Sequence, residues 1–316
     1  MKDVAKFVGV SPPKLPSQKQ MDEEFPVQSI NWDLLSKGNV DTSKTSVTWI
    51  GHATCLLQLN GYNILTDPMF SYRCSASQYV GPARYRSPPC TVQELVSKLQ
   101  LDAVVVSHNH YDHLDYNSIQ DLVKYSDKPL VFVVPLGLKD WFHDNINLSQ
   151  NGHSVVELDW HESHSVKDTS LTVTALPMQH WSSRRGYDRD KTLWCGFSIT
   201  SGDESKKALF TGDTGWFEGV HDIGRDYGPF QVAMIPIGAY EPRDFMKPQH
   251  INPHEAVQMM KAFQSKFAVP IHWGTFQLTW EGYLEPREHL QKSLEDAKIP
   301  TETFPSWSIG ETVVFD

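Results

Sequence analysis

One short run of residues carries much of this chain's capacity for chemistry. The segment LDAVVVSHNHYDHLD places an apolar strand, residues 101–106, directly before His108, His110, Asp112 and His113. Zinc in proteins prefers imidazole nitrogen, often with a carboxylate oxygen added, whereas softer metal sites use thiolates. An extended segment directs His108 and His110 to one side, and a turn after them can aim Asp112 and His113 at a second metal. The run therefore predicts a zinc centre rather than a solvated polar loop.

Three further candidate ligands lie at the ends of later apolar runs. They are His180 in TALPMQHW, Asp213 in LFTGDTG and His272 in AVPIHWG, each placed where a strand end can line a site. Taken alone, His180 is more typical of a hydrogen-bonded structural histidine, and TGDTG of an Asx-type turn. Together with the four earlier residues they make seven ligands, the number that a dinuclear site with one bridging carboxylate uses.

A phosphate site is indicated by a separate motif. Gln249 and His250 immediately precede Asn252, which reads as the N-cap of a helix. The free backbone amides and positive dipole end of a helix attract anions. His250 could therefore donate to a phosphoryl oxygen or supply a proton to a leaving alkoxide. The alternative is an ordinary surface histidine on a loop.

The elements that must position these residues are mainly short strands. Helices are predicted at TVQELVSKL, where Thr91 and Glu94 are spaced as a capping box, at INPHEAVQMMKAFQSKF, with Pro253 at its first position, and at PREHLQKSLEDA, beginning at Pro286. Early strands form hairpins and helices are interspersed, so we expect an α/β fold, a β-sandwich with helices on both outer faces. Strands of about 5 to 8 residues are predicted at SVTWIG, TCLLQL, YNILTD, LDAVVVS, PLVFVVP, SVVELD, LTVTALP, CGFSIT, KALFTGD, QVAMIPIG and FAVPIHWG.

Length and composition leave the number of domains open. The chain has 316 residues with 40% hydrophobic and 21% charged residues, which is typical of a globular protein of one or two domains. Residues 1–40 include SPPKLPSQKQ and little apolar periodicity, so they are expected to form a largely irregular N-terminal extension. Because ligands from His108 to His272 must meet at one site, residues 41–316 are expected to form a single domain.

Composition also disfavours several classes of protein. A net charge of -10 argues against a nucleic-acid partner, including a nucleic-acid phosphodiesterase. The longest apolar stretch, residues 130–138, is interrupted by Pro135 and is far shorter than the ~20 residues that cross a bilayer. The start of the chain does not resemble a signal peptide, so we expect an intracellular protein. Its four cysteines are spaced for neither a CxxC motif nor a disulfide framework, and we expect them to be reduced.

The motifs resemble those of a known family. HNHYDH followed by single His, Asp and His ligands is similar to the metallo-β-lactamase superfamily. WIGHAT, ILTDPMFSYR, SQYVGPARYR, GAYEPRDFMKPQH and IHWGTF resemble the N-acylphosphatidylethanolamine-hydrolysing phospholipase D family, over about residues 46–285. The resemblance implies an αββα sandwich in residues 41–316 and a phosphodiesterase that releases N-acylethanolamine and phosphatidic acid. It also implies a homodimer, peripherally associated with internal membranes on their cytoplasmic side.

The resemblance further implies a role for each site residue. His108, His110 and His180 would hold one Zn²⁺, Asp112, His113 and His272 a second, and Asp213 would bridge them. Asp112, Asp213 and His250 would be catalytic, and Gln249 and His250 would face the substrate phosphate. Asp67 in LTDP resembles a carboxylate that orients a ligand imidazole, and a simple turn residue before Pro68 is an equal alternative.

A lipid substrate requires apolar surface beside the metals. Most of the apolar side chains near the ligands are expected in the core, with a few at exposed loop tips. In the N-terminal arm, Lys2, Lys6, Lys14 and Lys19 could favour anionic lipid. Alternatives are a hydrolase of another phosphodiester or a lactone, a di-iron protein, which would need a carboxylate in place of His110, and a non-catalytic lipid binder. The nearby apolar candidates are Met69, Phe70, Trp181, Trp216, Phe217, Phe245, Met246, Phe276 and Trp280.

Overall fold

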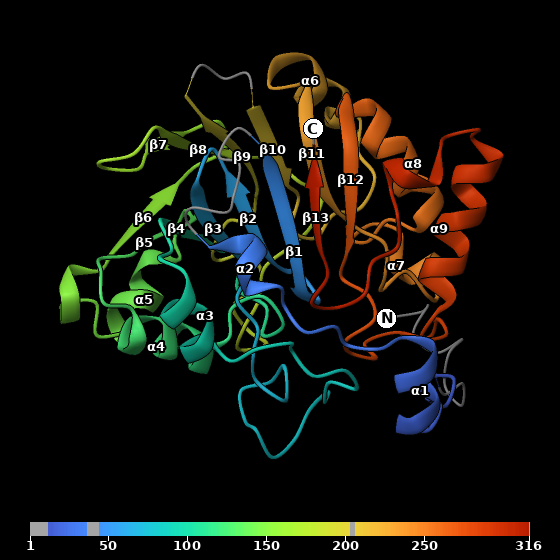
Figure 1. Cartoon of the computed structure of the whole chain (residues 1–316), viewed down its shortest axis with the longest axis horizontal. Helices are drawn as coiled ribbons and strands as arrows, with labels where there is room; N and C mark the ends of the chain where they lie inside the picture. Colours follow the sequence, from blue (N-terminus) through green and yellow to red (C-terminus); the bar gives the residue numbers. More distant parts are fainter. Residues whose placement is uncertain (1–11, 37–43, 203–205, 316) are drawn as a thin grey trace.

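Two mixed β-sheets pack face to face in a computed structural model that describes residues 12–36, 44–202 and 206–315 (Figure 1). The first sheet has the strand order β13-β1-β2-β3-β4-β5-β6, with β1 (Thr45–Gly51), β2 (Thr54–Leu59), β3 (Tyr62–Thr66), β4 (Ala103–Val105), β5 (Val131–Pro135), β6 (Ser154–Leu158) and β13 (Thr312–Phe315). The second has the order β12-β11-β10-β9-β8-β7, with β7 (Ser163–Ser165), β8 (Leu171–Leu176), β9 (Gly196–Ser201), β10 (Lys206–Phe210), β11 (Phe230–Pro236) and β12 (Ser265–Ile271).

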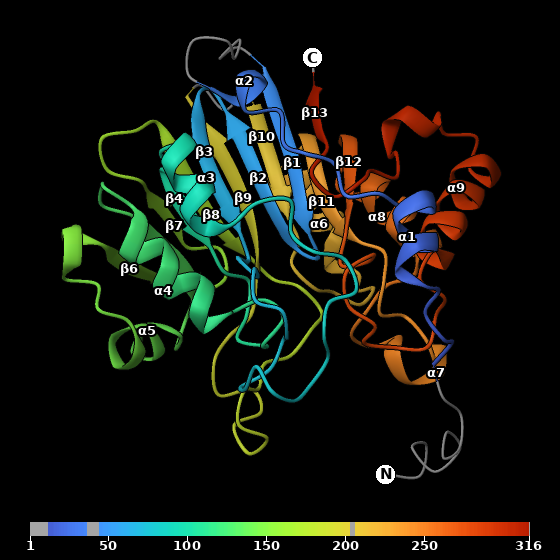
Figure 2. The ribbon, with the colours of Figure 1, turned by 60° about the horizontal axis from the view of Figure 1, so that its bottom comes forward.

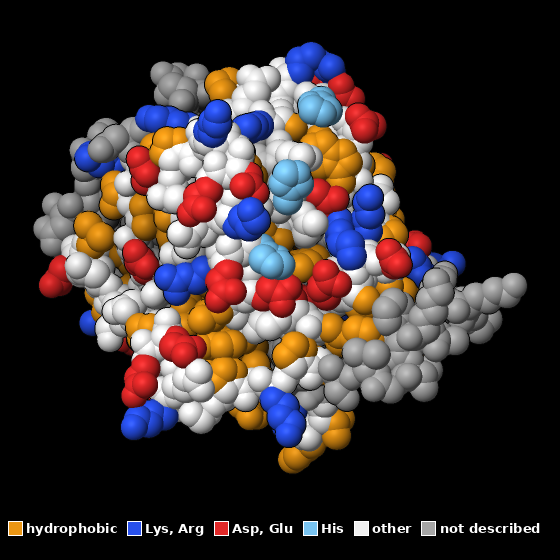
Figure 3. Space-filling view, turned by 90° about the vertical axis from the view of Figure 1, so that its right-hand side faces the viewer, with side chains coloured by type: hydrophobic (Ala, Val, Ile, Leu, Met, Phe, Trp, Pro, Cys, Tyr) orange, Lys and Arg blue, Asp and Glu red, His pale blue; other side chains and the backbone are white. Residues whose placement is uncertain are grey.

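Helices cover both outer faces of the sandwich, so the predicted αββα fold is confirmed. The first sheet is covered by α3 (Val92–Lys98), α4 (Tyr116–Tyr125) and α5 (Lys139–Asn145). The second is covered by α6 (Gly219–Asp226), α8 (Pro253–Ala262) and α9 (Glu285–Asp296). A short helix, α7 (Arg243–Met246), precedes α8. The face over α8 and α9 mixes acidic and basic side chains (Figure 3).

Period-two alternation in the strands builds two apolar layers. Leu57 and Ile64 point between the sheets, where they join the same buried cluster as Phe197 of the second sheet. Their neighbours Leu56 and Leu65 belong instead to the cluster beneath α3, α4 and α5. Because β2, β3 and β4 are apolar on both faces, their sequences read as continuous hydrophobic runs.

Strand direction places the candidate ligands at one edge of the sandwich. β1, β2 and β3 form antiparallel hairpins, but β3, β4, β5 and β6 are parallel, as are β10, β11 and β12. Asp67 and His108 follow the carboxyl ends of the parallel pair β3 and β4, whereas Asp213 and His272 follow those of β10 and β12. Parallel strands end at the same edge, so these four residues come together from both sheets.

Most elements lie where the sequence predicts them. Thr91 and Asn252 accept hydrogen bonds from the amides of Glu94 and Glu255, as N-caps of α3 and α8. The sequence analysis missed the polar three-residue strand β7 and the terminal strand β13, which pairs with β1. Of the helices it predicted α3, α8 and α9 and missed the others, among them α4, whose N-cap Asp115 is hidden within the acidic and histidine-rich ligand segment. The four cysteines are buried and free.

The described part of the N-terminal arm packs on the sandwich. It contains α1 (Gln18–Glu24) and α2 (Trp32–Leu35), and Phe25 lies with its ring centroid 4.9 Å from that of Trp273. Lys14 and Lys19 are exposed, whereas Lys2 and Lys6 lie outside the described residues. The division into an extension and a domain stays a prediction, although Phe25 is part of the buried core. Among the described residues, no helix combines the length and apolar character needed to cross a membrane.

Candidate metal centre

All seven predicted ligands converge on one buried cluster. His108, His110 and His180 bring their ligand nitrogens within 4.8 Å of one another. His108 Nε2 lies 2.8 Å from His110 Nδ1, and His180 Nε2 lies 3.3 Å from the same His110 atom. These residues come from two chain segments, after β4 and after β8, so this group exists only in the folded protein.

A second group contains three of the four remaining predicted ligands and one further histidine. Asp112, His113, His272 and His52 place their ligand atoms within 4.8 Å of one another. Asp112 Oδ2 is 3.3 Å from His272 Nε2 and 3.4 Å from His113 Nε2. His52 Nε2 lies 2.9 Å from the same carboxylate oxygen.

Asp213 lies between the two groups. Its Oδ2 is 3.1 Å from Nε2 of His113 and 3.1 Å from Nε2 of His272, in the second group. The same oxygen is 3.9 Å from His108 Nε2 and 3.7 Å from His180 Nε2, in the first. One carboxylate therefore faces nitrogens of both groups, the arrangement required of a bridging ligand.

The turn that carries Asp213 approaches the turn after β4 closely, and this contact depends on the glycine that precedes Asp213. Gly212 has a φ of 59°, and a Cβ there would lie 2.5 Å from Ser107 Cβ, closer than side-chain carbons approach. The turn after β10 therefore fits against the turn after β4 only with glycine at this position. This contact brings Asp213 beside the ligand-bearing segment that begins at His108.

Hydrogen bonds from outside the ligand set fix several ligand rings. Asp67 Oδ2 accepts a hydrogen bond from His113 Nδ1 at 2.6 Å, and the Asp67 carboxylate also accepts from the Ser107 amide and hydroxyl. On the opposite side, the Gln249 backbone oxygen accepts from His180 Nδ1 at 3.0 Å. Such contacts set the tautomer and direction of ligand imidazoles. The geometry thus favours the orienting role for Asp67 over that of a simple turn residue.

His52 is a site residue that the sequence analysis missed. It lies in the turn between β1 and β2 with a φ of 54°, and His272 has a φ of 62°, both in the left-handed region. The His52 backbone oxygen accepts from the His272 amide at 2.9 Å and from Trp49 Nε1 at 2.9 Å. Strained backbone of this kind is retained where the surroundings over-determine it. The signal was present in WIGHAT, where a histidine follows a strand end.

The charge state of the first group suits metal binding. Burial lowers the pKa values of His108, His110 and His180 below their ordinary value, so these rings are neutral at pH 7. Burial alone would raise the pKa of Asp213, but the charges of His113, His272 and His250 outweigh it and hold that pKa well below its usual range. Neutral imidazoles and ionised carboxylates are the forms that donate electron pairs to a metal.

The second group needs positive charge. Asp67, Asp112 and Asp213 are three buried or nearly buried carboxylates around His113. Burial alone would lower the pKa of His113, but these carboxylates, Asp213 foremost, raise it well above its usual value. A bound cation can supply this positive charge in place of the proton. Nε2 of His110, His113 and His272 and Oδ1 of Asp213 are buried without a hydrogen-bond partner, so the residues present fit a metal centre.

The predicted phosphate residues lie beside this cluster, but not as the sequence analysis assumed. His250 is only 7% exposed, which excludes the surface-histidine alternative, and its Nε2 lies 4.0 Å from Asp213 Oδ2. The Gln249 side chain instead donates weakly to Met246 Sδ at 3.6 Å. The first turn of α8 is not free for an anion, because Asn252 and Glu255 form a complete capping box there.

Only one of the apolar candidates named above is exposed. Of the nine candidates, Phe245 is exposed, whereas Met69, Met246 and Phe276 are buried and the others are partly buried. Large exposed side chains occur instead on two loops that begin at site residues, residues 67–91 after β3 and residues 180–195 after β8. The two loops lie side by side below the sheets in Figure 2. The exposed residues on these loops are Tyr72, Tyr79, Val80 and Tyr187.

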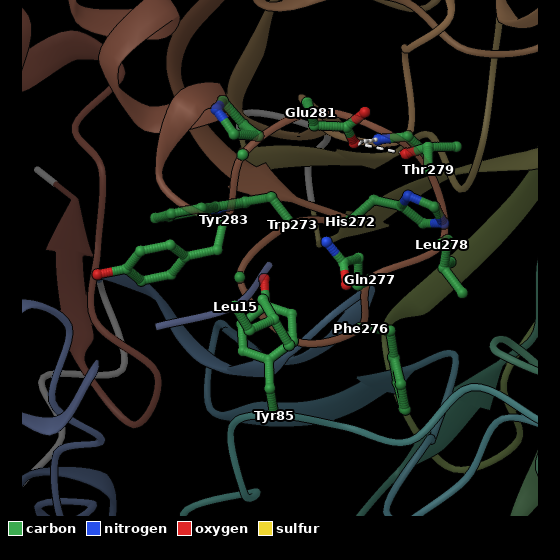
Figure 4. A pocket seen from close by; sticks show the side chains of 14 residues that line it. Leu15, Tyr85, His272, Trp273, Phe276, Gln277, Leu278, Thr279, Glu281 and Tyr283 are labelled. Carbon is green, nitrogen blue, oxygen red and sulfur yellow. Dashed lines mark hydrogen bonds between the residues drawn. The ribbon is translucent and has the colours of Figure 1, made fainter. Parts of the chain in front are cut away.

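A pocket lined in part by the predicted ligand His272 opens beside the cluster (Figure 4). Its wall includes Leu15 of the N-terminal arm together with Tyr85, Phe276 and Tyr283. Burial raises the pKa of Tyr283 to about 12. The wall also includes Gln277, Thr279 and Glu281, so polar and apolar groups share this pocket.

Comparisons with known proteins give matches over most of the chain. A family model described as a beta-lactamase superfamily domain matches residues 62–273. N-acyl-phosphatidylethanolamine-hydrolyzing phospholipase D 1 of Caenorhabditis elegans is 40% identical over 304 residues, 94% of this chain and 82% of that protein. The Saccharomyces cerevisiae protein named N-acyl-phosphatidylethanolamine-hydrolyzing phospholipase D, mitochondrial, is 35% identical over 275 residues, 85% of this chain and 56% of that protein.

A solved structure shows the same fold. A metallo hydrolase from the archaeon Ignicoccus hospitalis superposes with a TM-score of 0.61 at 21% sequence identity. The match covers 86% of this chain and 99% of that one. At this level of identity the likeness concerns the fold alone.

Proposed function

The chain belongs to the N-acyl-phosphatidylethanolamine-hydrolysing phospholipase D family of the beta-lactamase superfamily, and we propose that it uses two Zn²⁺ ions to hydrolyse N-acylphosphatidylethanolamine. It is a metal-dependent hydrolase, and the proposed products are N-acylethanolamine and phosphatidic acid. The observation that carries the proposal is the position of Asp213 Oδ2, 3.1 Å from His113 and from His272 and also facing His108 and His180. Imidazoles and carboxylates without any thiolate favour zinc among the metals of this fold.

The direct test is to identify the products. The zinc-loaded protein is incubated with vesicles containing N-acylphosphatidylethanolamine, and the lipids are analysed by mass spectrometry. Equal amounts of N-acylethanolamine and phosphatidic acid are expected. Release of fatty acid, or no product, would overturn the proposed substrate. Parallel assays with short water-soluble phosphodiesters and with lactones test whether the same site serves a different hydrolase.

The proposed reaction is attack by water at phosphorus. When bound, the two ions would supply an activated water at neutral pH and positive charge for the phosphoryl oxygens. The water oxygen joins phosphorus, the bond from phosphorus to the ethanolamine-side oxygen breaks, and the proton that the water gives up ends on the released alkoxide. Hydrolysis in isotopically labelled water should therefore place the label in phosphatidic acid. Label in N-acylethanolamine would contradict attack at phosphorus.

His250 is proposed to hold a phosphoryl oxygen by a hydrogen bond. Burial lowers the pKa of His250 to about 3, and nearby metal cations would act in the same direction. The ring is therefore neutral at pH 7 and retains one N–H donor. This favours the hydrogen-bonding role for His250 over that of an imidazolium proton source. Gln249 is proposed to contribute mainly through its backbone oxygen, which orients His180.

His250→Ala is expected to lower kcat by roughly 100-fold, as expected for the loss of one hydrogen-bond donor to a transition state. Metal content measured by mass spectrometry should be unchanged, because the seven ligands remain. His254→Ala, which removes an exposed histidine from the first turn of α8, is the matched control and should retain normal kcat. Loss of metal from His250→Ala would identify His250 as a ligand and overturn the role proposed here.

Peripheral membrane association is proposed to use the two loops beside the site. Tyr79 is 92% exposed, Tyr187 78% and Val80 65%, and tyrosine combines an apolar ring with a polar tip that suits a lipid surface. These loops begin immediately after Asp67 and His180, so contact with lipid would bring the bilayer to the metal centre.

Replacing Tyr79, Val80 and Tyr187 together by serine is expected to weaken binding to phospholipid vesicles by at least about tenfold, because apolar area no longer leaves water. Co-sedimentation over a range of lipid concentrations measures this change. Val314→Ser removes a 40% exposed apolar side chain from the edge strand β13 and should leave binding unchanged. Unchanged binding of the triple variant would exclude these loops as the docking surface.

Assembly and location follow from family membership as proposals. We infer a homodimer, which sedimentation equilibrium of the purified chain tests directly, with a monomer as the contrary result. We also propose that the protein associates with internal membranes on their cytoplasmic side. Protection from protease added to intact organelles would contradict that orientation.

A further inference from the structure

A single arginine side chain spans the metal-ligand loop. Arg184 Nη1 donates to the backbone oxygen of Asn109 at 3.0 Å and to that of Leu114 at 2.8 Å. These two oxygens bracket the part of the loop that carries His110, Asp112 and His113. We infer that Arg184 is a positioning residue that holds residues 109–114 in the shape that binds metal. The inference rests on the metal centre proposed above.

The guanidinium group is itself held between aromatic rings. Its central carbon lies 4.1 Å from the ring centroid of Tyr111 and 5.0 Å from that of Trp141. Burial lowers the pKa of Arg184 to about 10, so the side chain remains charged at neutral pH. A planar cation can stack on aromatic rings while one of its nitrogens donates to two carbonyls, whereas an ammonium group can donate but has no planar face to stack.

Arg184 itself extends from the loop at residues 182–190. Asp188 Oδ1 accepts hydrogen bonds from the backbone amides of Arg184 and Arg185 at 2.9 and 2.8 Å and from Ser183 Oγ at 2.8 Å. This turn fixes the backbone from which Arg184 extends. The side chain therefore links the loop that carries Tyr187 to the loop that carries three metal ligands.

The loop has few internal hydrogen bonds to replace this contact. The amides of His113 and Leu114 both donate to the His110 backbone oxygen, at 3.1 and 2.9 Å, and form its turn. Neither bond involves the backbone oxygens that Arg184 contacts. Without Arg184 these oxygens would have to be solvated by water, which imposes no fixed separation between them. The ligand side chains would then lose the common orientation required for tight metal binding.

The test measures metal release rather than catalysis. Arg184→Ala removes the guanidinium from beside Tyr111 and Trp141, and Arg184→Lys keeps the charge and a nitrogen donor but loses the planar group that stacks on the two rings. Each protein is loaded with zinc or cobalt, and release to a chelating indicator and the cobalt absorption spectrum are recorded. Lys191→Ala removes an exposed positive charge from the same loop region as the matched control.

We expect Arg184→Ala to lose metal about 10- to 100-fold faster than the wild type, with an altered cobalt spectrum, and Arg184→Lys to be intermediate. Added ethylguanidinium should restore slow release and the wild-type spectrum, whereas ethylammonium should not. If Arg184→Ala does not fold, Arg184→Lys is measured against Lys191→Ala in the same assays.

Three results would overturn the inference. They are release from both Arg184 variants at the wild-type rate, equal rescue by both cations, and equally fast release from Lys191→Ala. Wild-type protein that binds no metal would instead contradict the proposed metal centre, so the two failures are distinguishable. Thermal unfolding of the metal-free proteins shows whether a change in release accompanies a change in global stability.

Discussion

Asp213→Asn is expected to reduce hydrolysis of N-acylphosphatidylethanolamine by at least about 1,000-fold, at the upper end of the effect of removing one transition-state-stabilising group. The carboxylate is the one ligand whose single oxygen faces both histidine groups. An asparagine amide offers one neutral oxygen and an NH₂ group that would point N–H donors at this space. It cannot replace an anion between two cations.

The measurement is kcat on lipid vesicles together with metal content per chain. We expect metal content to fall along with kcat, because Asp213 contacts nitrogens of both groups. Asp222→Asn is the matched control, because Asp222 is exposed on α6, pairs with Arg225 at 2.6 Å and is not one of the site residues. Activity that survives in Asp213→Asn would show that the histidine cluster is structural and would remove the basis of the proposed function.

Asp67→Asn is expected to lower metal affinity by about 10- to 100-fold although Asp67 is not a proposed ligand. Its Oδ2 accepts from His113 Nδ1 and from Ser107 Oγ, both at 2.6 Å, and the side chain is fully buried. The amide retains only one acceptor oxygen, so it cannot satisfy the Ser107 amide and the His113 ring as the carboxylate does. The His113 ring then loses the partner that directs Nε2 at the centre.

The same substitution should reduce the free energy of unfolding of the metal-free protein by about 1–3 kcal/mol, because it leaves a buried donor unpaired. Denaturant unfolding of the metal-free chain measures the free energy of unfolding, and competition with a chelator measures the metal affinity. Asp102→Asn is the comparison, in the loop between α3 and β4, where Asp102 Oδ2 accepts from the Asn63 amide at 2.8 Å. A normal metal affinity in Asp67→Asn would show that His113 is oriented without this carboxylate.

Local sequence signals account for much of the fold. Short, mainly apolar runs such as TCLLQL identify strands that are buried on both faces, and Thr91 and Asn252 identify helix starts because their side chains cap backbone amides. Signals of this kind act within a few residues. The pairing of β13 with β1 joins Phe315 to Thr45, and no local pattern could specify such a partner.

The same distinction between local signals and long-range contacts applies to the site residues. Residue types alone identified His108, His110, Asp112 and His113, because imidazole and carboxylate groups in a short run after a strand have few other uses. Their immediate partners could not be found from residue types. The Asp67 contact with His113, the His52 contact with Asp112 and the Arg184 contact with Asn109 each join separate chain segments.

By itself, the sequence determined the chemistry available to this protein: imidazole nitrogen and carboxylate oxygen donors placed at strand ends, with no thiolate among them. Only the tertiary structure decided which donors face a common point, because that depends on two sheets packing with the carboxyl ends of β4, β10 and β12 at one edge. It also decided the charge of each donor, since burial and the proximity of Asp213 move the pKa values of His108 and His113 in opposite directions.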